Sequence, residues 1–264
     1  MTLDFSDSGD SAVEIGEPIR HKSRVVETWT LRGSAGDEVA VDAHVPVDDP
    51  QRIVVMAHGA DNSRKARYVE VAGKSFTRHA TAVVAMDAPL HGDRVSARPM
   101  TDPVGIQADL LVQSVRDHRR LLDAVVARWP GIPIGFAGFS MGGLFGVPLV
   151  AIDERIRSAA IVIAGSTRVS YPQRFGRLDK QARERLAVTD PVIHAPRVGN
   201  RPVLLLNADA DELVSREAAI ALYDAFTGPK ELVFMPGTHT EWGYAARWFR
   251  RLEQFFVETL RNTE

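Results

Sequence analysis

The 264-residue chain contains no cysteine. This absence excludes a disulfide framework, zinc sites with thiolate ligands and a cysteine nucleophile. No apolar run reaches the roughly 18 residues that a membrane-spanning helix needs, and the acidic stretch 1–18 lacks the apolar segment of a secretory signal. The formal net charge is only −2, so no charge excess indicates binding to nucleic acid or to an acidic membrane. We therefore expect a cytoplasmic protein with neither partner.

What the chain does contain is an ordinary globular composition, with 45% hydrophobic and 25% charged residues. Its length suits one α/β domain with a full core. Residues 1–22 are polar at their start, and we expect them to form a loosely held N-terminal arm. Residues 23–264 are expected to form the single domain.

Eight apolar segments have the pattern of β-strands, and helical patterns separate most of them. The expected strands are 24–33, 38–47, 52–59, 81–89, 132–139, 158–165, 202–209 and 230–237. This alternation predicts an α/β fold with a mostly parallel eight-stranded sheet and helices on both faces. The first two strands, joined by a short turn, would form an antiparallel edge. The polar segment 166–200 has no strand pattern, so we expect a short cap insertion of one or two helices there.

The segment "GFSMG" (138–142) fits the pattern G-x-S-x-G. It follows an apolar strand and opens a helical segment, which is the context of a sharp turn that exposes a serine above a sheet. Glycines on both sides are needed because a Cβ there would clash with the neighbouring strand and helix. The alternative is that the serine merely caps the helix. The context favours Ser140 as a nucleophile.

A serine nucleophile needs a base and a carboxylate that orients the base. His239 follows the last expected strand, at the sheet edge where active sites of open α/β folds collect. His58 and His91 also end strands, and we interpret them as loop-shaping residues. Asp209, Asp211 and Glu212 follow the expected strand 202–209. We favour Asp211, because it lies beyond the strand and because the order Ser, Asp, His is typical of the α/β-hydrolase triad.

Hydrolysis through a serine also needs an oxyanion hole made of two backbone N–H groups. One should belong to Met141, directly after the nucleophile. The other should come from the loop that follows the third strand, where Ala60 is the best candidate and Gly59 gives the loop its freedom.

Together these motifs resemble those of serine hydrolases of the α/β-hydrolase superfamily, and in particular small carboxylesterases of the dienelactone-hydrolase and acyl-peptidase-like branch. The matching segments, in chain order, are "AHGAD" (57–61), "MDAPLHGDR" (86–94), "GFSMGG" (138–143), "NADADELV" (207–214) and "PGTH" (236–239). Two positions depart from this pattern. Ala208 stands where many relatives have glycine, and the nucleophile is serine where dienelactone hydrolases proper have cysteine, which favours ordinary esters as substrates.

The resemblance implies a carboxylesterase that acts on short- to medium-chain acyl esters, small molecules, with no cofactor and no metal. The alternatives are a peptidase or amidase, or a thioesterase, with the same triad, and a non-catalytic small-molecule receptor with this fold. We expect the insertion to roof the site and to offer an acyl pocket, although the same side chains would equally serve to pack the insertion onto the core. The candidate pocket residues are Tyr171, Phe175, Leu178 and Leu186.

Overall fold

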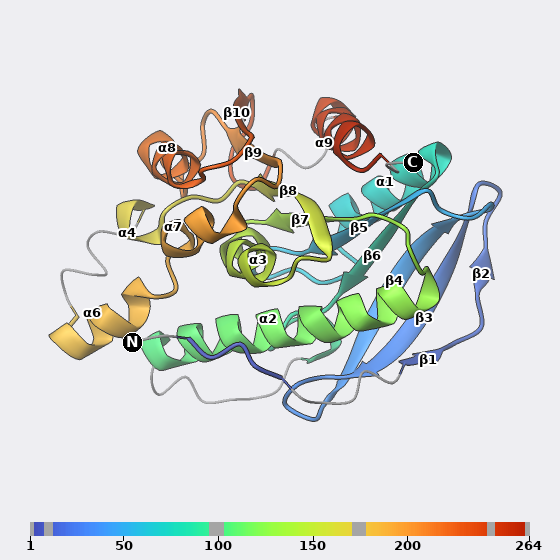
Figure 1. Ribbon diagram of the computed structural model, residues 1–264, viewed down its shortest axis with the longest axis horizontal. Coiled ribbons are helices and arrows are strands. Elements are labelled where there is room, and N and C mark those ends of the chain that lie inside the picture. Colours follow the sequence, from blue (N-terminus) through green and yellow to red (C-terminus); the bar gives the residue numbers. More distant parts are fainter. Residues whose placement is uncertain (1–2, 8–12, 95–102, 171–177, 242–245, 262–264) are drawn as a thin grey trace.

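The computed structural model describes residues 3–7, 13–94, 103–170, 178–241 and 246–261. In this part of the chain a ten-stranded sheet has the order β1-β3-β4-β6-β5-β7-β8-β9-β10, and β2 pairs with β3 off that path (Figure 1). The strands are β1 (Val13–Ile15), β2 (Ile19–Arg20), β3 (Arg24–Arg32), β4 (Glu38–Pro46), β5 (Arg52–Ala57), β6 (Thr81–Met86), β7 (Ile134–Phe139), β8 (Ile156–Val162), β9 (Val203–Ala208) and β10 (Lys230–Met235).

The strands from β6 to β10 in this order run parallel, whereas β3, β4 and β6 pair antiparallel. This arrangement confirms the mostly parallel sheet with an antiparallel edge. Every residue of β6, β7 and β9 is buried. Strands that are covered on both faces read as continuous apolar runs, which is why the sequence marks them so clearly.

Helices cover both faces of the sheet. They are α1 (Arg67–Phe76), α2 (Pro103–Arg128), α3 (Met141–Ile152), α4 (Thr167–Ser170), α6 (Lys180–Ala187), α7 (Pro191–His194), α8 (Arg216–Ala225) and α9 (Ala246–Thr259), with 3-10 turns η1 (Thr77–His79), η2 (Gly92–Arg94) and η3 (Ala195–Val198). Helices α2, α3 and α8 share one hydrophobic core, and α1 and α9 share the core on the opposite face. No helix in the described ranges is both long enough and apolar enough to span a membrane.

The expected number of eight strands is wrong, because the N-terminal arm adds β1 and β2. Both pair antiparallel with β3. The strands are too short to be recognised in the sequence, and backbone hydrogen bonds to β3 stabilise them. The first segment of the arm, which contains Asp7, is bound to α2. The guanidinium of Arg120 donates to both carboxylate oxygens of Asp7, at 2.5 and 2.8 Å. The same guanidinium donates to the carbonyl oxygens of Arg32 and Gly33. The arm is therefore attached to the domain along both segments.

The segment 166–200 lies between β8 and β9 and contains α4, α6, α7 and η3 within its described residues, more helices than the sequence predicts. Asp190 joins the two ends of this insertion. Its buried carboxylate caps α7 by accepting from Val192 N–H, and it also accepts from the hydroxyl of Ser166 and the N–H of Arg168. The insertion packs against α2, α3 and α8.

The Arg120–Asp7 contact predicts how firmly the arm supports the fold. Replacing Arg120 with alanine removes both of its guanidinium hydrogen bonds to the largely buried carboxylate of Asp7, which should cost about 3 kcal/mol of unfolding free energy. Arg116 on the same helix contacts Asp4, whose side chain is 73% exposed, so Arg116→Ala should cost far less. Urea unfolding of both variants measures the difference. Equal losses in the two variants would contradict this role of Arg120.

Candidate active site

Ser140 lies at a sharp turn between β7 and α3. Its backbone has φ 50° and ψ −113°, a conformation that an L-residue rarely adopts. Hydrogen bonds on both sides hold it there: Ser140 N–H donates to Val162 O at 2.8 Å, and Ser140 O accepts from the N–H groups of Gly143 and Leu144. The structure around the turn therefore determines a strained conformation that the turn would not keep alone.

The two glycines that flank the serine have no room for a side chain. A Cβ on Gly138 would lie 2.4 Å from Gly142 O, and a Cβ on Gly142 would lie 2.3 Å from Ala57 O. Both contacts are with backbone atoms, which cannot move aside as the end of a flexible side chain can. The spacing of glycines in the motif thus follows from the close approach of α3 to β5 and β7.

Three side chains from three separate loops form a continuous chain of contacts. Ser140 Oγ lies 2.9 Å from His239 Nε2, and His239 Nδ1 lies 2.9 Å from both carboxylate oxygens of Asp211. A carboxylate can only accept, so Nδ1 carries the proton and Nε2 is free to accept from the serine hydroxyl. The side chain of Asp211 is 1% exposed, and it also accepts from Leu213 and Val214 N–H.

The other two acids of this cluster, Asp209 and Glu212, accept hydrogen bonds from the loop that carries His239. Glu212 accepts a hydrogen bond from the backbone N–H of His239 at 3.0 Å, and Asp209 accepts from Gly237 N–H at 3.2 Å. Both therefore connect the loop after β9 to the loop that carries His239. The sequence analysis missed the role of Glu212. The only available signal was the acidic residue next to Asp211, because its partner is 27 residues further along the chain.

The two candidate oxyanion donors are the backbone N–H groups of Met141 and Ala60. Met141 is the first residue of α3, where a helix leaves backbone N–H groups without partners inside the helix. Across from it, a Cβ on Gly59 would lie 3.4 Å from Ser140 Cβ, so the loop after β5 runs directly beside the serine. The N–H of Gly59 donates to the hydroxyl of Tyr68 at 2.9 Å. That bond occupies the N–H of Gly59, and Ala60, the next residue, also lines the cavity that contains Ser140.

A cavity of about 390 Å³ opens in front of these groups, and Ser140, His239, Ala60 and Tyr68 all line it. Ser140 also lines a much smaller cavity of about 30 Å³, together with Thr167 and Ser170 of α4 and several apolar and small residues.

The four residues predicted to line an acyl pocket all belong to the insertion 166–200. Tyr171 and Phe175 lie outside the residues that the structure describes. Leu178 is half-buried, and Leu186 is buried on α6, which packs against α2. Neither leucine is among the described residues that line the two cavities.

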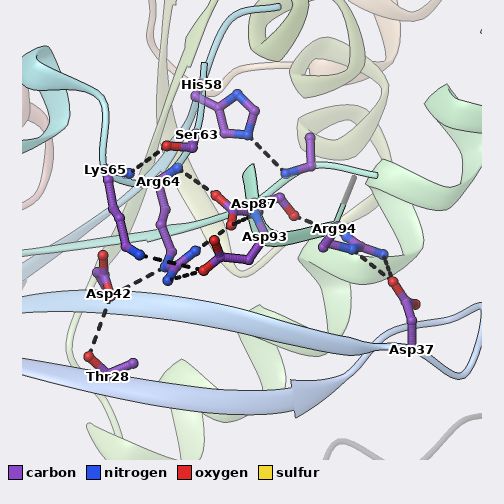
Figure 2. Close-up of polar contacts among 11 residues, drawn as sticks. Thr28, Asp37, Asp42, His58, Ser63, Arg64, Lys65, Asp87, Asp93 and Arg94 are labelled. Carbon is purple, nitrogen blue, oxygen red and sulfur yellow. Dashed lines mark hydrogen bonds and ion pairs between the residues drawn. The ribbon is translucent and has the colours of Figure 1, made fainter. Parts of the chain in front are cut away.

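An ionic network around the buried Asp87 lies between the loops that follow β5 and β6 (Figure 2). Asp87, which follows β6 and is fully buried, forms an ion pair with the guanidinium of Arg64 and accepts from Arg64 N–H at 2.8 Å. It also accepts from Asp93 N–H, and Arg94 donates to its carbonyl oxygen. The hydrogen bond from Arg64 lowers the pKa of the exposed Asp93 carboxyl. This network joins the loops that follow β5 and β6.

The two strand-end histidines have loop contacts, as the sequence analysis expected. His58 is buried, with Nδ1 at 2.7 Å from Gly59 O and Nε2 accepting from Ala88 N–H at 2.9 Å (Figure 2). Nδ1 of His91 lies 2.8 Å from Pro89 O. Burial lowers the pKa of His58, so the ring stays neutral.

Comparisons with known proteins agree with this architecture. The family model of serine aminopeptidases, S33, matches residues 48–198. A cold-adapted esterase from an Arctic intertidal metagenomic library has a TM-score of 0.74 and 25% identity, with 93% of this chain and 98% of that chain covered. An acetyl xylan esterase from Paenibacillus sp. R4 has a TM-score of 0.76 at 20% identity, covering 94% of this chain and 88% of that one. TT1662 from Thermus thermophilus has a TM-score of 0.72 at 23% identity, with coverages of 90% and 99%.

No curated protein matches the chain significantly. The family model, however, spans more than half of the chain, including the loop after β5, the turn at Ser140 and α3. The neighbours under 25% identity extend the same fold over nearly the whole length. The protein therefore belongs to the serine aminopeptidase S33 family and is a serine hydrolase with the α/β-hydrolase fold.

Proposed function

We propose that this serine hydrolase is a carboxylesterase that cleaves short- to medium-chain acyl esters of small molecules. The observation that carries the proposal is the unbroken chain of contacts from Ser140 through His239 to the buried carboxylate of Asp211. The similarity to an esterase at 25% identity over most of both chains supports an ester substrate. A cytoplasmic location stays a prediction of the sequence.

The geometry suits a two-step reaction. Ser140 Oγ attacks the ester carbonyl carbon while His239 Nε2 takes the hydroxyl proton, and the carbonyl oxygen gains the negative charge. The N–H groups of Ala60 and Met141 would stabilise that charge. His239 then passes the proton to the departing alcohol as the C–O bond breaks. Water, deprotonated by the same nitrogen, attacks the acyl-enzyme, and the acid leaves as Ser140 regains its proton. Asp211 holds the tautomer and stabilises the imidazolium.

The insertion contributes to the site in this proposal. Its first helix, α4, brings Thr167 and Ser170 to the small cavity beside Ser140, which supports segment 166–200, within the single domain 23–264, as a partial roof over the site. A cavity of about 30 Å³ on that side has room for a small group only. The larger cavity, at about 390 Å³, is near the lower end of typical ligand pockets and suits the other half of a small ester.

Replacing Ser140 with alanine tests the assignment. The variant should lose about 10⁴-fold or more in kcat on p-nitrophenyl acetate, because removing any member of a triad has an effect of this size. Its circular dichroism spectrum should match that of the wild type, and a fluorophosphonate probe should label only the wild type. Retained turnover in the alanine variant would refute the assignment. Assays of the wild type with aminoacyl p-nitroanilides test the peptidase alternative. A higher kcat/KM on the anilides than on the esters would favour that alternative.

Asp211→Asn should be far more damaging than Asp209→Asn. The asparagine can present its N–H₂ to Nδ1 of His239 and so select the wrong tautomer, which should cost roughly 10⁴-fold in kcat. The carboxylate of Asp209 accepts from Gly237 N–H, at the start of the loop that carries His239, so its neutral variant is a matched control within the cluster. Steady-state kinetics on one ester compares the two. A larger loss in the Asp209 variant would assign the orienting carboxylate to that residue instead.

Acyl-chain preference should be for short esters. The modest cavities predict that kcat/KM is highest between acetyl and about hexanoyl p-nitrophenyl esters and falls for longer chains. A series of p-nitrophenyl esters from acetate to palmitate, assayed below the solubility limit of each, measures this preference. A maximum at dodecanoate or beyond would contradict it.

A further inference from the structure

Both ring nitrogens of His58 have partners of fixed type. Ala88 N–H can only donate, so Nε2 must be the unprotonated nitrogen that accepts from it, at 2.9 Å. The ring proton therefore sits on Nδ1 and is donated to the carbonyl oxygen of Gly59, at 2.7 Å. One neutral tautomer satisfies both contacts, and the ring is 1% exposed. His58 thus connects the loop after β5 with the loop after β6.

The bond to Gly59 O acts on the neighbouring amide through the peptide plane. The C=O of Gly59 and the N–H of Ala60 belong to the same planar trans unit and point in opposite directions. Holding the carbonyl toward the His58 ring therefore sets the direction of the Ala60 N–H, on the side away from the ring. A flip of this peptide would exchange donor and acceptor at the position beside Ser140.

Other contacts hold neighbouring parts of this loop, and they do not involve the Gly59–Ala60 peptide. Tyr68 accepts from Gly59 N–H, on the preceding peptide. Further along, Arg64 is anchored to the buried carboxylate of Asp87 (Figure 2). Ala88, the second partner of His58, follows Asp87 directly, so the imidazole rests on the same anchored segment. Among these contacts, only the one from His58 bonds to the Gly59–Ala60 peptide itself.

We propose that His58 is a positioning residue for ester hydrolysis: through the Gly59–Ala60 peptide it aims the Ala60 N–H at the oxyanion formed on the Ser140 adduct. The inference rests on the proposed function, because it assigns a role within that reaction. His58 does not touch the reacting atoms and transfers no proton to them. Its part is to keep one backbone donor preorganised, which is where much of the catalytic effect of an oxyanion hole arises.

Two substitutions each remove one of the two hydrogen bonds that the His58 ring makes and keep the other. The side-chain amide nitrogen of asparagine occupies the position of Nδ1, so His58→Asn can still donate to Gly59 O but loses the contact with Ala88. The amide group of glutamine reaches the position of Nε2, so His58→Gln can still accept from Ala88 N–H but loses the donor to Gly59. Each variant thus keeps one loop contact and removes the other.

We expect kcat of His58→Gln to fall by about 10²-fold with little change in KM, since a misplaced catalytic group costs about that much. His58→Asn should keep kcat within about tenfold of the wild type. Phenylboronic acid, whose tetrahedral serine adduct places an oxygen in the oxyanion hole, should bind less tightly to His58→Gln in proportion to the loss of kcat/KM. The carboxylic acid product, which forms no such adduct, should bind both variants equally.

His118→Gln is the control for replacing a buried histidine. His118 is also 1% exposed and its Nδ1 lies 2.8 Å from the carbonyl oxygen of Ser114, but it lies on α2 away from the two cavities. This variant should lose thermal stability and keep kcat. Equal losses of kcat in the asparagine and glutamine variants of His58, at equal melting temperatures, would overturn the proposal, as would wild-type boronate affinity in His58→Gln. A wild-type protein whose Ser140 resists a fluorophosphonate probe would instead refute the proposed function itself.

Discussion

The close approach of α3 to the ends of β5 and β7 is the constraint on which the rest of the site depends. It forces Ser140 to φ 50° and leaves no space for a Cβ at Gly138 or Gly142. Backbone hydrogen bonds to Val162 O and from the first turn of α3 offset the strain of this conformation. Because the turn is held so tightly, the serine hydroxyl is presented in one place, and His239 and the proposed oxyanion donors can be arranged around it.

Parallel strands explain why groups far apart in the sequence meet there. Ser140 and His239 are 99 residues apart, and His239 and Asp211 are 28 apart, yet each lies just beyond the carboxyl end of its strand. Neighbouring parallel strands bring these ends to one edge of the sheet. The loops only need to reach across one or two strands. Glu212 accepts a hydrogen bond from the backbone N–H of His239, so His239 is held at both its ring and its main chain.

A buried ion pair, Asp87 with Arg64, connects the loops after β5 and β6 near the site. Asp87 is fully buried and satisfied by Arg64 and by the backbone N–H groups of two loops. A buried carboxylate is costly unless it is paired and hydrogen-bonded, so such a residue strongly favours the one loop arrangement that satisfies it. Together with the neutral ring of His58, it supports the loop beside Ser140 through polar contacts.

The sequence by itself determined the features that depend on neighbours along the chain. Continuous apolar runs mark the buried strands, and the spacing of Gly138, Ser140 and Gly142 marks the turn, since the sterics of that turn are local. The tertiary structure alone decided the pairing of β1 and β2 with β3 and the partners of Glu212 and His58. Short strands have no pattern of their own, and a hydrogen bond between two loops depends on a distance that only the packed sheet sets.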